Sequence, residues 1–123
     1  MAIPSGSGSE VLKSVYKEAL TNSVVKLIDG VANHIYTILT ITWCEMGADA
    51  TNGIDLYVDL AGNDVSGGSG KDIYILNEHN VGSRETFVYS DRFVITGEDE
   101  LFTRISTSAN VDVVCTYIDQ SWI

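Results

Sequence analysis

Proline and cysteine are scarce in this sequence, and long apolar runs are missing. Pro4 is the single proline, and Cys44 and Cys115 are the only cysteines. No apolar run approaches the ~20 residues of a membrane-spanning helix, and the N-terminus lacks the basic and apolar regions of a signal peptide. We therefore expect a protein made in a cytoplasm that does not enter membranes, with both cysteines reduced and buried.

Positive charge is also scarce. Seven Lys and Arg residues face 17 Asp and Glu residues, which gives a net charge of −10 and a pI near 4.3. Such a chain repels phosphate backbones, so nucleic-acid binding is not expected. Residues 1–28 hold three lysines against two glutamates (net +1), whereas the remaining 95 residues hold four bases against fifteen acids (net −11). The N-terminal segment is therefore electrostatically distinct from the body.

Signatures of catalysis and of metal binding are missing as well. Neither His34 nor His79 has a Cys or His two to five residues away, as a zinc site would need. No Gly-x-Ser-x-Gly motif is present, and the Gly70-Lys71 pair lacks the other residues of a phosphate-binding loop. We expect no enzymatic activity, no cofactor and no metal.

The length of 123 residues suits one domain. The pattern of the chain's residues is that of β-strands. Residues 54–60 show the pattern of a half-buried strand, in which four aliphatic residues alternate with Asp55, Tyr57 and Asp59. The four are Ile54, Leu56, Val58 and Leu60. Apolar or alternating runs predict strands at 24–28, 35–44, 54–60, 73–76, 87–95, 101–105 and 111–118. Seven or eight such strands without a helix of ten residues predict an all-β fold, an antiparallel, jelly-roll-like β-sandwich over residues 23–123.

The segment 35–44 is apolar on both sides, although a strand that faces water on one side normally alternates. Strict alternation would place Ile35, Leu39, Ile41 and Trp43 on one face and Tyr36, Ile38 and Cys44 on the other. Two explanations remain open: the second face meets another chain or the N-terminal arm, or a β-bulge switches the faces midway.

Residues 1–22 are expected to form an extended N-terminal arm. The first nine residues have little apolar surface, and the pattern of residues 11–20 fits either extended structure or a short turn of helix. Candidate partner-binding residues are Ile3, Pro4, Val11, Leu12, Lys13, Tyr16 and Lys17 in the arm, and Trp43, Trp122 and Ile123 elsewhere.

Three stretches carry a resemblance to a known family. They are Ala-Ile-Pro-Ser-Gly-Ser-Gly-Ser-Glu-Val-Leu-Lys at 2–13, Ala-Asn-His-Ile-Tyr-Thr-Ile-Leu at 32–39, and the closing region 93–101 with 111–122. Together they resemble small structural proteins of tailed-bacteriophage virions, of the head decoration (cement) type. The Gly-rich stretch 61–71 departs from that pattern and reads as an insertion.

The resemblance implies a non-enzymatic trimer on the capsid exterior that bridges subunits of the major capsid protein. The protein would then be located in the virion, which is assembled in the cytoplasm of a bacterial host. A neck or tail fibre module of the virion is one alternative. A carbohydrate-binding β-sandwich is another, in which Trp43, Trp122, Tyr57 and Tyr89 would stack on sugars.

Overall fold

A computed structural model describes residues 8–47, 52–61, 71–106 and 110–121 of the chain. These residues form nine β-strands, and none of them is helical. The strands are β1 (Ser9–Lys17), β2 (Val25–Asp29), β3 (His34–Glu45), β4 (Asn52–Leu60), β5 (Lys71–Val81), β6 (Thr86–Tyr89), β7 (Phe93–Thr96), β8 (Glu100–Ile105) and β9 (Val111–Ser121).

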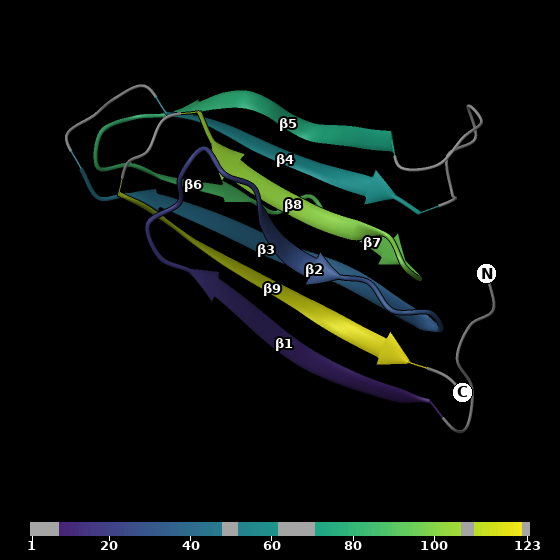
Figure 1. The fold of residues 1–123 in the computed structure, drawn as a ribbon. Helices are drawn as coiled ribbons and strands as arrows, with labels where there is room; N and C mark the ends of the chain where they lie inside the picture. The colour runs from purple at the N-terminus through teal and green to yellow at the C-terminus, as the bar shows by residue number, and fades with distance from the viewer. Residues whose placement is uncertain (1–7, 48–51, 62–70, 107–109, 122–123) are drawn as a thin grey trace.

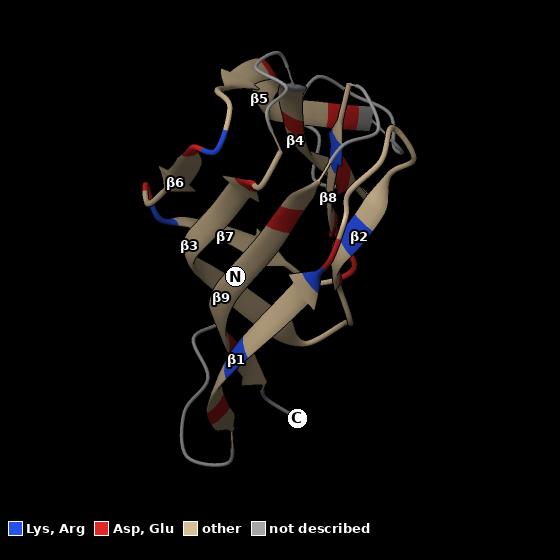
Figure 2. Ribbon diagram, turned by 90° about the vertical axis from the view of Figure 1, so that its left-hand side faces the viewer, with Lys and Arg blue, Asp and Glu red and all other residues tan. Residues whose placement is uncertain are grey.

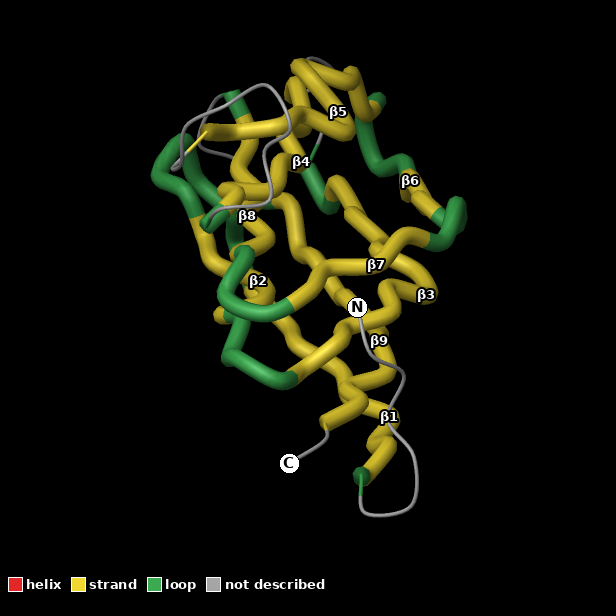
Figure 3. Tube along the Cα trace, turned by 90° about the vertical axis from the view of Figure 1, so that its right-hand side faces the viewer, coloured by secondary structure: helices red, strands yellow, loops and turns green. Residues whose placement is uncertain are grey.

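The strands form two antiparallel sheets that pack face to face (Figure 1). Sheet A has the order β1-β9-β3, and the other side of β3 is shared by β6 and β7, which pair with successive parts of it. Sheet B has the order β2-β8-β4-β5. Apart from β4 and β5, and β6 and β7, strands that follow one another in the chain lie in different sheets. Figure 3 shows the strands from a second side. With β6 and β7 sharing one strand position, this is the eight-position order of a jelly roll, which confirms the predicted fold class.

The apolar segment 35–44 owes its two apolar faces to a β-bulge. The register between β3 and β9 shifts between Ile38 and Thr40, so Leu39 is the extra residue. The shift brings Ile41 to the same side of the sheet as Tyr36 and Ile38, and all three are buried. The bulge explanation is therefore confirmed, and the faces assigned by strict alternation are wrong on the N-terminal side of Leu39.

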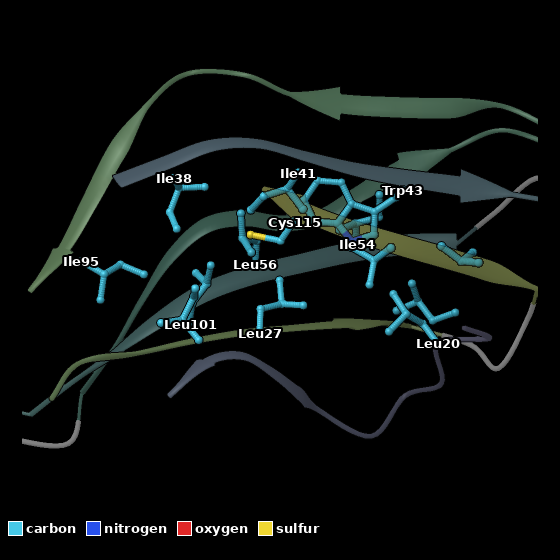
Figure 4. Close-up of a cluster of buried hydrophobic side chains, with 14 of the residues drawn as sticks. Leu20, Leu27, Ile38, Ile41, Trp43, Ile54, Leu56, Ile95, Leu101 and Cys115 are labelled. Carbon is cyan, nitrogen blue, oxygen red and sulfur yellow. The ribbon is translucent and has the colours of Figure 1, made fainter. Parts of the chain in front are cut away.

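The core lies between the sheets and is built around Trp43 of β3 (Figure 4). Trp43 is fully buried, stacks on Phe87 with ring centroids 5.8 Å apart, and donates a hydrogen bond from Nε1 to Thr103 Oγ1 at 3.2 Å. Thr103 in turn donates to the carbonyl oxygen of Asp55 at 2.8 Å. Trp43, expected at a partner interface, therefore serves the core instead, because the bulge turns it inward.

The predicted arm contains a strand of the sandwich. Residues Ser9–Lys17 form β1, which pairs with β9 over its whole length, from Ser9 opposite Ser121 to Lys17 opposite Val113. The open question about residues 11–20 is thus settled as extended structure up to Lys17. Ile3, Pro4, Trp122 and Ile123 lie outside the described residues, as does most of the Gly-rich stretch 61–71.

Candidate functional site

The outer side of sheet A carries almost no charge. Inward residues alternate with outward ones along each strand, so the buried Val113 and Cys115 fix Val114 and Thr116 as outward. Register and burial give the same side to Leu12, Ser14, Tyr16, Thr37, Thr40, Thr42, Val88, Val94, Val114, Thr116 and Ile118, which we call the sheet A face. Glu10 and Asp112 stand at its two ends.

Several apolar side chains of this face are open to solvent. Leu12 and Tyr16 of the edge strand β1 are 66% and 70% exposed, and Val88 and Val94 at the opposite edge are 50% and 52% exposed. Several exposed apolar side chains on one uncharged strand surface are typical of an interaction surface, whereas isolated ones are ordinary. The sheet A face is therefore the candidate site of this molecule.

Sheet B presents the opposite character. Four carboxylates stand side by side across its strands: Asp29 opposite Glu100, Glu100 opposite Asp59, and Asp59 opposite Asp72. Lys26 reaches Glu100 at 2.6 Å and Asp29 at 3.7 Å. Figure 2 shows acidic and basic segments on β2, β8 and β4, whereas β3 is free of charge over most of its length. Neighbouring like charges repel, so sheet B disfavours contact with a second acidic copy.

An ionic cluster holds β1 against the rest of sheet A. Lys13 points to the inner side of β1, where its Nζ lies 2.9 Å from Asp119 Oδ2. Nδ1 of His34 lies 2.7 Å from Asp119 Oδ1, and Asp119 is only 7% exposed. Burial by itself would raise the pKa of Asp119, but the hydrogen bonds from Lys13 and His34 outweigh it, so the pKa of Asp119 lies below its ordinary value. The hydrogen bond between Lys13 and Asp119 also raises the pKa of Lys13.

Asp119→Asn is expected to lower the free energy of unfolding by about 1–2 kcal/mol at neutral pH, because Lys13 loses its ionic partner. A carboxylate whose pKa is depressed by folding stabilises the fold above its unfolded pKa, here 3.8, and loses that contribution as the pH falls through its folded pKa. Urea unfolding of both proteins between pH 7 and pH 2.5 measures this. The difference between them should shrink as the pH falls below 3.8; a difference that is the same at pH 5 and at pH 2.5 would contradict the ionic role.

The structure divides the predicted site residues of β1 between its two sides. Leu12 and Tyr16 lie on the sheet A face, whereas Val11, Lys13 and Lys17 lie on the inner side of the strand. Val94, Val114 and Ile118 also lie on the sheet A face and are not among the predicted residues. One signal in the sequence points to Val114 and Ile118: residues 113–118 include no charged residue, so neither face of this strand has to be in contact with water.

Other chemistries find little support in the described residues. The rings of His79 and Phe87 are tilted against each other with their centroids 4.1 Å apart. No group of three or more His, Cys, Asp or Glu among the described residues is arranged to hold a metal ion. Tyr57 is 8% exposed and lies between Tyr74 and Phe102, so its ring is covered rather than open to a sugar. The described part of the chain contains no helix capable of crossing a membrane.

Comparison with known proteins shows the fold alone. No protein-family model and no curated protein matches the sequence. Among solved structures, a chain of the infectious bursal disease virus particle superposes with a TM-score of 0.53 at 6% identity, over 92% of this chain and 31% of the viral one. The VP2 subviral particle of that virus gives 0.50 at 10% identity, over 94% and 33%.

A Bacillus endospore appendage pilus gives a TM-score of 0.47 at 12% identity, covering 100% of this chain and 97% of the appendage chain. The viral chains are longer than this one, which spans about a third of their length. It is a jelly-roll β-sandwich similar in fold to part of viral particle proteins.

Proposed function

We propose that the protein is a non-enzymatic structural component of a virion that assembles with copies of itself through the sheet A face. The observation that carries this proposal is an uncharged, partly apolar strand surface on a chain with a net charge of −10. In its specific form, the protein is a head decoration, or cement, protein of a tailed phage. Three copies would then sit on the capsid exterior and bridge subunits of the major capsid protein.

The size of the sheet A face fits such an assembly. Nine residues of β1 at ~3.4 Å each and four strand positions at ~4.8 Å give a footprint of about 600 Å². A specific interface of standard size covers about 800 Å² per partner, so the face would supply roughly three quarters of such a contact and the residues around it the rest. Its exposed leucine, tyrosine and valine side chains supply apolar area, and burying that area between copies would stabilise the assembly.

The charge distribution favours one orientation. With the sheet A face turned toward the assembly axis, the carboxylates of sheet B point away from the neighbouring copies. An acidic outer surface also suits a protein on the outside of a capsid, because it repels nucleic acid rather than binding it. A neck or tail fibre module would need the same self-assembly, so the position in the particle separates the two roles.

The proposal is tested by sedimentation of the purified protein and by imaging of labelled protein on particles. At micromolar concentration we expect a species with three times the 13.3 kDa of the chain. On particles, label spread over the head supports decoration, and label confined to the neck or tail moves the assignment to that module. A monomer throughout the micromolar range would contradict the assembly itself.

A further inference from the structure

We infer that strand β1 is exchanged in the assembly, so that β1 of one copy completes sheet A of the next by pairing with its β9. This inference rests on the proposed self-assembly and names the segment through which the copies recognise one another. The partner is therefore a second copy of this chain.

Strand β1 contributes little to the core of its own domain. All of its residues except Val15 are exposed, and Val15 is the one that packs on the core. Lysines rather than large apolar residues flank Val15 on the inner side, at positions 13 and 17. Among the described strands, β1 pairs with β9 alone. Removing β1 therefore uncovers one edge of β9 without emptying the interior.

The segment that follows β1 has the features of a strained hinge. Leu20 is fully buried and donates its backbone N–H to the carbonyl of Val111 at 2.8 Å, which fixes the point where the chain joins the body. Ala19, immediately before it, has a φ of 53°, a left-handed conformation that is unfavourable for a residue with a Cβ. Its N–H bonds to Asp112 Oδ1 at 2.9 Å. A short strained connection favours exchange, because opening it releases the strain.

Charge complementarity supports a second copy as the acceptor. Residues 1–28 carry a net charge of +1, whereas residues 29–123 carry −11. An exchanged β1 would place Lys13 of one copy on the buried Asp119 of the next, at the contact that the two residues make within one chain. Each acidic body would thereby receive a cation from its neighbour. Donating to one copy while receiving from another is a head-to-tail arrangement, which is compatible with the closed trimer proposed above.

A disulfide across the β1–β9 pair tests the exchange directly. Ser14 lies opposite Thr116 with their hydroxyl oxygens 3.3 Å apart, so S14C with T116C can form a cross-strand disulfide. The native cysteines are first replaced, as C44S and C115A. After oxidation of the assembled protein, a denaturing gel without reductant should show covalent dimers and trimers. The matched control, T40C with T116C, joins β3 to β9, which stay in one chain, and should give only cross-linked monomers.

The outcomes separate this inference from the proposed function. A trimer whose Ser14–Thr116 cross-links all lie within one chain overturns the exchange and leaves the self-assembly standing. A protein that sediments as a monomer overturns both. If the first pair of substitutions prevents folding, S9C with S121C tests the same contact, because those two hydroxyl oxygens are 2.8 Å apart.

Discussion

Trp43→Ala is expected to lower the free energy of unfolding by about 3–5 kcal/mol, the usual cost of emptying a large aromatic site in a core. Trp43 is 0% exposed and joins β3 of sheet A to Thr103 on β8 of sheet B through its indole N–H. The substitution removes the ring and the hydrogen bond between the sheets at once. For a domain of this size, the melting temperature should fall by roughly 10–20 °C, which calorimetry or circular dichroism measures.

The matched control is Trp43→Phe, which keeps an aromatic ring beside Phe87 but has no indole N–H. Thr103 keeps its hydrogen bond to the carbonyl of Asp55, so the loss should be about 1–2 kcal/mol. A melting temperature of Trp43→Ala close to that of the unchanged protein would contradict the central place of Trp43 in the core.

Val94→Glu is expected to weaken self-association by ~100-fold or more, because a carboxylate in the contact would lose its hydration without gaining a partner. Val94 lies on β7 opposite Thr37, within the sheet A face, and is 52% exposed. The folded monomer should therefore tolerate the substitution. Sedimentation over a range of concentrations should show monomer where the unchanged protein is trimeric. The melting temperature of the variant should equal that of the unchanged protein diluted until it is also monomeric.

Val31→Glu is the matched control for this variant. Val31 has the same exposed fraction, 52%, but lies between β2 and β3, outside the sheet A face. It adds the same negative charge to the chain, so a general effect of charge would appear in both variants. Equal dissociation of both, or of neither, would contradict a contact through the sheet A face.

Much of the fold could be predicted because strands leave local signals. Alternating Ile54, Leu56 and Val58 predicted β4, and its first two alternating side chains are fully buried. The sequence does not show that β1 is part of the sandwich, because β9, its partner among the described strands, lies about a hundred residues away in the sequence. Its own composition, with two lysines on the inner side, gives no amphipathic pattern. Pairing across such a distance is a property of the whole chain.

Only part of the candidate site could be predicted from the sequence. Leu12 and Tyr16 were recognisable as apolar residues in a polar segment, and both are exposed on the sheet A face. Trp43, named as a partner-binding candidate, lies in the core instead, because one inserted residue, Leu39, puts it on the same side of the sheet as Tyr36 and Ile38. The sequence does not mark the position of that bulge.

The reactivity of Cys44 in the assembled protein tests most directly whether the sheet A face is covered. Cys44, expected to be buried like Cys115, is only partly buried: it lies between the buried Trp43 and Glu45 and so points outward on sheet A, opposite Asp112 at one end of the sheet A face. Cys115 is buried and its pKa is raised to about 12, so it provides an unreactive internal reference. A thiol reagent is expected to modify Cys44 slowly in the trimer and at least about tenfold faster in the dissociated Val94→Glu variant. Equal rates in the two proteins would show that copies of this chain do not meet through sheet A.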